Sequence, residues 1–158
     1  MIKGEKLNMK DLLGEKKAVA HIALVVHDIE KTSQDYADFF GIAKPDWFWA
    51  GGGAEAMNYR GESSEAKAKL AFLKIDTITI ELIEPDKGPS VWREFLDKYG
   101  EGFHHLGFNI NGMEKTLALM GENNMPTLQR GGKEVGGWYS YVDTRDSVKM
   151  MIELLEGY

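Results

Sequence analysis

Two histidines and two glutamates recur at matching places in this sequence, and all four side chains are of types that bind metal ions. Residues 21–32, which begin with His21, align without a gap on residues 105–116, which begin with His105. A second pair of matching runs, IELIE at 80–84 and IELLE at 152–156, closes each half of the chain. Their first glutamates follow the histidines by 60 and 48 positions. The candidate metal ligands are therefore His21, Glu81, His105 and Glu153.

Strand alternation indicates why these glutamates should face a ligand. Successive side chains of a strand point to opposite faces, so Thr79, Glu81 and Ile83 are expected on one face and Ile80 and Leu82 on the other. The same rule applies to the second run. A carboxylate among apolar neighbours is costly to bury unless it is paired or bound to a metal. Two such carboxylates, brought to two imidazoles by a pseudo-twofold pairing of the halves, predict a cation site.

The donor set limits the ion. The chain contains no cysteine, so a metal must be held by nitrogen and oxygen atoms. Such mixed ligands fit a divalent ion of Mn, Fe, Co, Ni or Zn. Four protein ligands on a six-coordinate ion would leave two positions for water or for a chelating substrate.

The alternative for each residue is a role in the fold alone. Taken singly, a strand histidine or glutamate is more often a surface residue or a hydrogen-bonded core residue. Fold maintenance needs apolar periodicity rather than repeated metal-binding side chains, so the repeat favours ligands. His27 and His104 have no counterpart in the repeat, and we expect them at the surface or beside a ligand.

Each half is predicted to fold as β-α-β-β-β, which gives an α+β protein of two modules related by an internal pseudo-twofold repeat, with a curved sheet around the metal cleft. Asp28 and Asn111 stand where a helix N-cap is expected after each opening strand. Both helices are expected to end near a glycine, Gly41 or Gly121. The helix residues predicted to face the core are Ile29, Tyr36, Phe39 and Phe40 in the first half and Met113, Leu117 and Met120 in the second.

Short apolar runs predict the remaining elements. Residues 70–73 and 78–83, with a turn around Asp76, are expected to form a hairpin. Strands are expected at 127–129, 138–142 and 148–155, and a linking helix at 91–99. The predicted organisation is an N-terminal tail at 1–17, a first module at 18–86, a linker helix at 87–103 and a second module at 104–158.

Composition excludes several classes of function. With 158 residues, 43% of them hydrophobic, the chain is long enough to bury a core. No apolar run reaches the length of a membrane span and no signal peptide is visible, so a cytoplasmic location without a membrane partner is expected. The net charge of -6 and the lack of a basic run argue against nucleic acid. A small-molecule substrate is expected instead.

These features resemble the vicinal oxygen chelate superfamily, which includes glyoxalase I, methylmalonyl-CoA epimerase, extradiol dioxygenases and bleomycin-resistance proteins. The run GEGFHHLGF at 100–108, preceded by FLDK at 95–98, is similar to the epimerase pattern of a short helix, Gly-Glu-Gly, two histidines and an apolar strand. The run IELIEP at 80–85 is similar to the second ligand strand of the family. The resemblance covers residues 18–156 and selects His105, the second of the two histidines, as the ligand.

The resemblance to epimerases implies proton transfer at the carbon beside a thioester carbonyl, with the metal holding the enolate oxygen and carboxylates as bases. Glu153 is then both a ligand and a candidate catalytic base. A second family glutamate precedes the second ligand by sixteen positions, which corresponds here to Glu65. The family follows it with His-Gly-Val, whereas this chain has Ala-Lys-Ala. The other interpretation of Glu65 is an exposed loop carboxylate.

Aromatic and cationic residues suggest how a substrate could be held. Flat side chains offer a large contact area, so aromatic residues could floor a pocket, although such residues more often belong to the core. Arg60, Arg93 and Arg130 are possible anchors for an anionic group, but a solvated surface position is the preferred interpretation. The candidate pocket aromatics are Trp47, Trp49, Trp138, Tyr139 and Tyr141.

Three classes of function remain open. The first is a metal-dependent isomerase, epimerase or lyase, including a glyoxalase I-like lyase, that acts beside a carbonyl or an acyl-CoA thioester. The second is an extradiol dioxygenase, whose pattern of two histidines, one glutamate and iron uses fewer ligands than this chain offers. The third is a ligand-sequestering protein like the bleomycin-resistance proteins. A homodimer is expected, with the site formed either within one chain or across the dimer.

Overall fold

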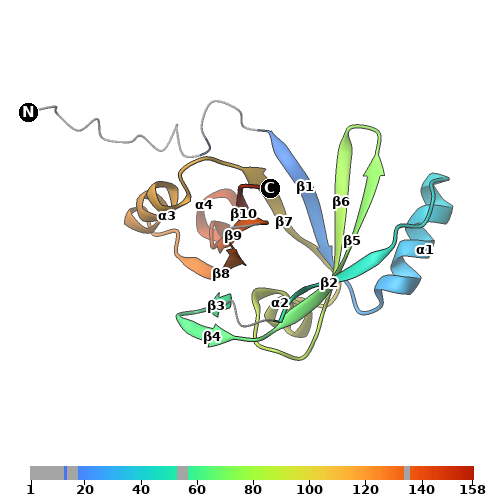
Figure 1. Cartoon of the computed structure of the whole chain (residues 1–158), viewed down its shortest axis with the longest axis horizontal. Coiled ribbons are helices and arrows are strands. Elements are labelled where there is room, and N and C mark those ends of the chain that lie inside the picture. The colour runs from blue at the N-terminus through green and yellow to red at the C-terminus, as the bar shows by residue number, and fades with distance from the viewer. Residues whose placement is uncertain (1–12, 14–17, 53–56, 134–135) are drawn as a thin grey trace, which may run out of the picture.

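The computed structural model describes residues 13, 18–52, 57–133 and 136–158 (Figure 1). Apart from Leu13, the predicted N-terminal tail at 1–17 lies outside the described residues. The described part forms one strongly curled ten-stranded sheet with a small number of helices against it. Within these ranges no helix combines the length and the apolar character needed to cross a membrane.

The order of elements repeats in the two halves. The first half contains β1 (Val19–Val25), α1 (Ile29–Phe40), β2 (Trp47–Gly51), β5 (Lys67–Ile75) and β6 (Ile78–Pro85). Helix α2 (Val91–Tyr99) leads to the second half, with β7 (Gly102–Asn109), α3 (Met113–Glu122), β8 (Thr127–Lys133), β9 (Gly137–Val142) and β10 (Met151–Glu156). The additions are β3 (Met57–Tyr59), β4 (Glu62–Ser64) and α4 (Arg145–Val148). The predicted α+β fold of two β-α-β-β-β modules is confirmed.

The sheet brings the two halves together edge to edge. Its strand order is β2-β5-β6-β1-β7-β10-β9-β8-β3-β4. At its centre β1 and β7 pair antiparallel, and each pairs in parallel with the last strand of its own half, β6 or β10. Corresponding strands therefore stand at equal distances from the β1–β7 junction, as a pseudo-twofold repeat requires.

The hairpin of β3 and β4 departs from this symmetry. It lies between β2 and β5 in the sequence, yet β3 pairs with β8 at the other end of the sheet. The chain thus crosses to the edge of the second half and returns (Figure 1). The module boundaries at 18–86 and 104–158 stay a prediction, and this hairpin is the part of the first segment that joins the sheet of the second half.

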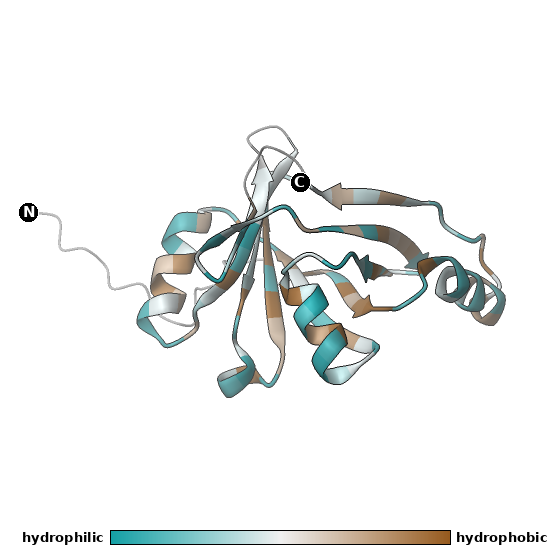
Figure 2. Ribbon diagram, turned by 90° about the horizontal axis from the view of Figure 1, so that it is seen from below, coloured by the Kyte–Doolittle hydropathy of each residue, from teal (hydrophilic) through white to brown (hydrophobic). Residues whose placement is uncertain are grey.

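Helix α1 buries a narrow stripe against the sheet. The stripe consists of Ile29, Ser33 and Ala37, which are spaced four residues apart. The prediction that Phe39 and Phe40 face the core is wrong, because their exposed fractions are 83% and 43%. Phe39, two positions after Ala37, points away from the stripe. Phe40 is the last residue of the helix and lies beyond Ala37, the last buried residue of the stripe. Hydrophilic and hydrophobic residues accordingly alternate along the helices in Figure 2.

The helix starts differ between the halves. Asp28 caps α1 as predicted, since its side chain accepts a hydrogen bond from Lys31 N at 2.9 Å. The prediction that Asn111 caps α3 is wrong: the N-cap is Gly112, whose φ of 84° lies in the left-handed region that glycine tolerates. The Gly112 N–H instead donates to the carboxylate of Glu156.

Glu84 and Glu156, the last residues of the two IEL runs, play the same part in their halves. Glu84 Oε2 accepts a hydrogen bond from the Ile29 N–H at 2.8 Å, as Glu156 does from Gly112. A carboxylate is favourable there because the free N–H groups give a helix start a partial positive charge. The second glutamate of each run therefore anchors a helix to the sheet.

Strand alternation separates a helix-covered face from a concave face. Ile80 and Leu82 of β6 contact the cluster under α1, and Ile152 and Leu154 of β10 contact the cluster under α3. Both opening helices thus cover the convex side, as the alternation predicts. The start predicted for the last strand is wrong, because Val148 ends α4 and the strand begins at Met151.

Candidate metal centre

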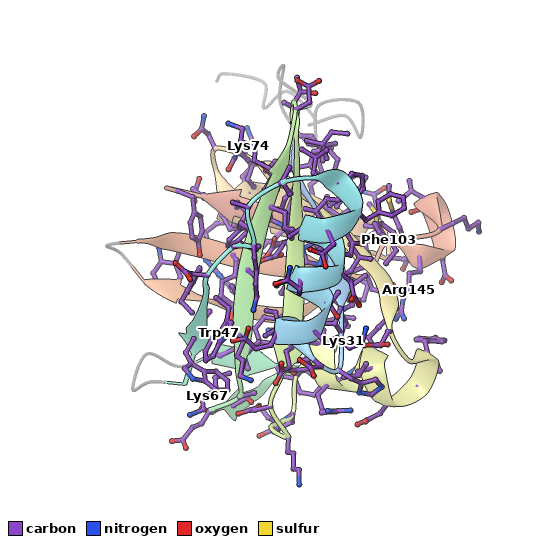
Figure 3. The ribbon with its side chains drawn as sticks, turned by 90° about the vertical axis from the view of Figure 1, so that its right-hand side faces the viewer. Lys31, Trp47, Lys67, Lys74, Phe103 and Arg145 are labelled. Carbon is purple, nitrogen blue, oxygen red and sulfur yellow. The ribbon has the colours of Figure 1, made fainter. Side chains whose placement is uncertain are left out.

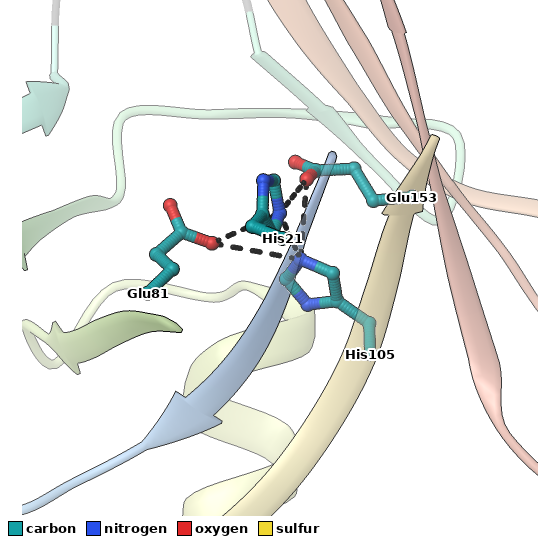
Figure 4. Close-up of side chains that lie close together, drawn as sticks. All are labelled: His21, Glu81, His105 and Glu153. Carbon is teal, nitrogen blue, oxygen red and sulfur yellow. Dashed lines mark hydrogen bonds and ion pairs between the residues drawn. The ribbon is translucent and has the colours of Figure 1, made fainter. Parts of the chain in front are cut away.

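The four predicted ligands converge on the concave face of the sheet. His21 comes from β1, Glu81 from β6, His105 from β7 and Glu153 from β10 (Figure 4). One ligand atom of each lies within 4.8 Å of those of the other three, and all four side chains are buried. The group forms within a single chain, at the junction of the two halves.

The contacts inside the group have the spacing of ligands around one ion. Glu153 Oε2 lies 2.8 Å from His21 Nε2 and 3.1 Å from His105 Nε2. Glu81 Oε2 lies 3.3 Å and 3.6 Å from the same two nitrogens, which are 3.1 Å apart. Ligands at about 2.1 Å from a metal and at right angles to each other are separated by about 3 Å. The donor atoms therefore fit a divalent cation between them.

Unsatisfied polar atoms support the same fit. Glu81 Oε2 is buried and has no hydrogen-bond partner among the described residues. Two imidazole nitrogens facing each other need a proton between them or a cation, since two lone pairs repel. A buried acceptor without a partner costs about 1–3 kcal/mol. A divalent ion would satisfy the carboxylate and both nitrogens.

The two carboxylates titrate differently because their partners differ. Burial and the nearby charge of Glu153 raise the pKa of Glu81, whose Oε2 accepts no hydrogen bond from the described residues. Burial also disfavours ionised Glu153, but His105 and the hydrogen bonds from both histidines outweigh it and lower the pKa of Glu153. Burial lowers the pKa of His105. For His21, the hydrogen bond to Glu153 and the charge of Glu81 outweigh burial and raise the pKa.

Small residues make room for the histidines across the β1–β7 pair. His21 stands opposite Gly107, and His105 stands opposite Ala23. In each half the small residue follows the histidine by two positions and pairs on its other side with the glutamate, Ala23 with Glu81 and Gly107 with Glu153. The repeated unit is therefore a histidine and a small residue on one strand, with a glutamate on the next.

The register of β1 and β7 shifts next to both histidines. One shift falls between Val19 and His21, and the other places His104 as an extra residue before His105. Bulges of this kind bend a strand and re-aim a side chain, and they are frequent beside active sites. Between β1 and β7 they occur immediately before the two candidate histidine ligands, His21 and His105.

His104 lies beside the candidate ligand His105, and His27 lies at the surface, which agrees with the two places expected for unrepeated histidines. His104 is 3% exposed, and its Nδ1 is 2.8 Å from His105 Nδ1. Burial, with the adjacent His105, lowers the pKa of His104 to about 3, so its ring is neutral at physiological pH. If His105 offers Nε2 to a metal, its Nδ1 carries the proton and donates it to His104.

A cleft of about 460 Å³ opens beside this group, and three of the four candidate ligands, His21, Glu81 and Glu153, line it. Its wall combines Phe48 and Phe72 from the first half with Tyr139, Tyr141 and Leu155 from the second. Trp92 of α2 and Tyr158 near the end of the chain also line it. This size lies within the range of pockets that enclose small organic ligands.

Only part of this lining matches the sequence prediction. Tyr139 and Tyr141 line the cleft as proposed. Trp47 lies on the outer face (Figure 3). Its Nε1 donates to Glu30 Oε1 at 2.5 Å, and the Lys69 ammonium lies over its ring. Trp49 and Trp138, 48% and 38% exposed, also do not line it.

Strand alternation would have found two of the four lining aromatics that the sequence prediction missed. Phe48 lies between two outward tryptophans and must point inward, and Phe72 pairs directly with Glu81. Trp92 lies on the linker helix α2, whose packing against the sheet no strand pattern predicts. Tyr158 follows the last strand and has no periodicity to place it.

The other singled-out residues lie outside the metal centre. Glu65 is exposed between β4 and β5 and does not line the cleft, so its role as a base stays a prediction. The three arginines form ion pairs outside the cleft lining; Arg60 is exposed, as the preferred interpretation has it, and Arg93 and Arg130 are half-buried. The pairs are Arg60 with Glu94, Arg93 with Asp97 and Arg130 with Glu114.

The curled sheet of two β-α-β-β-β modules has the architecture of the vicinal oxygen chelate fold. The sequence model of the Glyoxalase/Bleomycin resistance protein/Dioxygenase superfamily matches residues 20–142. The chain therefore belongs to this superfamily.

Individual relatives are distant. The chain is 24% identical over 142 residues to the uncharacterized protein YqjC of Bacillus subtilis (strain 168), covering 86% of this chain and 89% of that protein. The methylmalonyl-CoA epimerase of Mycobacterium tuberculosis has a TM-score of 0.63 at 18% identity, covering 96% of this chain and 93% of that one. A Streptomyces coelicolor methylmalonyl-CoA epimerase in complex with 2-nitronate-propionyl-CoA has a TM-score of 0.58 at 18% identity, covering 87% and 95%. At these identities the solved structures establish the fold.

Proposed function

We propose that this chain is a divalent-metal-dependent isomerase, epimerase or lyase that moves a proton beside a carbonyl or thioester group. The observation that carries the proposal is the buried group of His21, Glu81, His105 and Glu153 at the base of a cleft. A cation held there would stabilise the negative charge that develops on the substrate oxygen. The metal is proposed to be Mn, Fe, Co, Ni or Zn, since the donors are nitrogen and oxygen.

Glu153 is the proposed base. Its carboxylate lines the cleft and both histidines keep it ionised, so it can take a proton from a carbon placed above the site. The C–H bond breaks, its electron pair moves to the carbonyl oxygen, and the proton rests on Glu153 until it returns to the same or a neighbouring carbon. Two-base epimerisation needs another acid on the opposite face, and Glu65 would have to move to supply it.

Solvent exchange tests the reaction directly. The metal-reconstituted wild-type chain is incubated in deuterated water with propionyl-CoA and with butane-2,3-dione, and deuterium at the carbon beside the carbonyl is followed by NMR. We expect metal-dependent incorporation that Glu153→Gln abolishes and Glu65→Gln retains. Absence of exchange with either compound in the metal-loaded protein would count against proton transfer.

Sequestration of a ligand is the second candidate, and the aromatic cleft favours it. Phe48 and Phe72 line the cleft with 51% and 40% of their surface exposed. Exposed apolar rings in a cleft can hold a ligand without any catalytic step. In this case an added metal would leave ligand affinity unchanged, and the Glu153→Gln variant would bind as tightly as the wild type.

A further inference from the structure

We propose that the natural ligand carries an uncharged aromatic ring that stacks on Phe48 and Phe72 while its carbonyl oxygen faces the four-residue group. This inference rests on the proposed function for the role of the carbonyl. The ring position rests on contacts of the cleft alone. The ligand class is therefore an aromatic ketone or diketone, or a similar neutral carbonyl compound.

Phe48 and Phe72 form an aromatic surface that the described residues leave partly exposed in the cleft. Their rings are stacked, with centroids 6.1 Å apart and an angle of 23° between their planes. Both line the cleft, yet about half of each side chain is accessible to solvent. Exposed apolar rings inside a cleft mark a ligand surface, because water contacts them at a free-energy cost that a bound apolar group removes.

The position of Phe72 links this surface to the metal group. Phe72 pairs with Glu81 across β5 and β6, and its ring centroid is 6.3 Å from that of His21. Aromatic rings prefer to lie stacked or edge to face at such separations. A ligand ring on the Phe48–Phe72 surface would thus bring a carbonyl attached to it toward the ligand atoms.

The repeat shows that this surface is specific to the first half. Tyr141 is the counterpart of Phe72, because it pairs with Glu153 as Phe72 pairs with Glu81. Tyr141 is only 2% exposed, and its hydroxyl accepts a hydrogen bond from Trp92 Nε1 at 3.0 Å. The second-half ring is therefore buried in the cleft wall, whereas the first-half ring is exposed in the cleft.

The charge of the cleft favours a neutral ligand. No lysine or arginine is among the described residues that line it. The two carboxylates would balance the charge of a divalent cation, so a loaded site would have no excess positive charge. The Lys69 ammonium lies on the outer face, over the Trp47 ring, and pairs with Glu84 at 2.8 Å. A negatively charged group of a ligand would therefore meet no lysine or arginine side chain among the described residues of the cleft.

Matched probes test the ring. The aromatic probe is 1-phenylpropane-1,2-dione, and butane-2,3-dione presents the same two carbonyls without the ring. Dissociation constants are measured by ligand-observed NMR on the full chain, metal-reconstituted and metal-free. We expect the aromatic probe to bind about tenfold or more tightly, since a stacked ring adds about 1.4 kcal/mol or more.

Phe72→Leu and Phe48→Ala locate the preference. In either variant the aromatic dione should bind only about threefold or less more tightly than butane-2,3-dione, since each substitution removes one ring of the stack. Phe39→Ala is the control, because Phe39 is an 83% exposed phenylalanine on α1, outside the cleft. Circular dichroism confirms folding, and Phe48→Ala decides the result if Phe72→Leu does not fold.

The outcomes separate this inference from the proposed function. Equal affinity for the two diones, or tighter and salt-sensitive binding of propionyl-CoA, would overturn the aromatic assignment even if the protein holds a metal. A ring preference that persists without any metal bound supports the assignment while the proposed function fails. If Phe72→Leu and Phe48→Ala both kept the wild-type ratio of affinities for the two diones, the ring of the probe would bind elsewhere and the proposal would be overturned.

Discussion

Gly107 stands directly opposite His21, and a methyl group on residue 107 would lie 2.5 Å from the His21 ring atoms Cε1 and Nε2. No real Cβ contact is that short, so either the ring or the strand would have to move. The glycine therefore belongs to the metal centre although it offers no ligand atom.

Gly107→Ala should weaken metal binding while the chain still folds. Displacement of the His21 imidazole removes a nitrogen donor, and we expect affinity to fall by about tenfold or more, as for other perturbed ligand positions. Competition with a chromophoric chelator measures it. Gly121→Ala is the matched control, because a Cβ at Gly121 meets nothing within 4 Å. Equal metal affinity in the two variants would show that His21 does not bind the ion.

Glu81→Gln should stabilise the metal-free protein and weaken metal binding. Burial and Glu153 raise the pKa of Glu81 above 4.5, so the folded state keeps a proton that the unfolded state releases. The free energy of unfolding of the metal-free wild type should then fall as the pH rises from 4.5 toward neutrality. Urea titrations across this range should show a smaller fall for Glu81→Gln, and a gain of about 1–3 kcal/mol at pH 7. If Glu81→Gln were less stable than the wild type at pH 7, the Glu81 carboxylate would not destabilise the metal-free protein.

His104→Phe should lower metal affinity, and His104→Asn should largely preserve it. Phenylalanine fills the space but cannot accept the proton on His105 Nδ1, whereas asparagine offers an oxygen near the Nδ1 position. Loss of such a supporting contact typically lowers affinity about 10–100-fold. Chelator competition gives the affinity, and 15N NMR of the His105 ring reports which nitrogen is protonated. An identical effect of the two variants would indicate packing alone.

Glu84→Ala should lower stability and leave metal affinity unchanged. Glu84 accepts the Ile29 N–H and pairs with Lys69, and it lies three positions after Glu81 in the same run. Loss of a cap contact costs about 1 kcal/mol. Thermal unfolding and metal titration of Glu81→Ala and Glu84→Ala, measured side by side, should separate the two roles. If Glu84→Ala lost as much metal affinity as Glu81→Ala, the assignment of metal binding to Glu81 and helix anchoring to Glu84 would be wrong.

The sequence predicted the fold and the four converging residues because both depend on a repeat. Equivalent positions in two halves must meet when the halves pair edge to edge, so His21 and His105 could be placed together without coordinates. Alternation along β6 likewise placed Glu81 on the concave face. These positions could be predicted because successive side chains of a strand must point to opposite faces of the sheet.

Features without a repeat or a period could not be predicted. The hairpin of β3 and β4 pairs with a strand far away in the sequence, and no local pattern indicates that pairing. Phe39 and Phe40 look like core residues by hydrophobicity alone, yet the buried stripe of α1 is set by Ile29 and Ala37. Gly107 matters through the space it leaves, which depends on the register of β1 and β7.

Metal content tests the central claim most directly. The purified wild-type chain and a His105→Ala, Glu153→Ala double variant are freed of loosely bound ions, and elemental mass spectrometry measures each metal per chain. We predict about one divalent ion per wild-type chain and its loss in the double variant. Absence of metal from the wild type, even after reconstitution with Mn, Co, Ni or Zn, would contradict the metal centre and the reaction built on it.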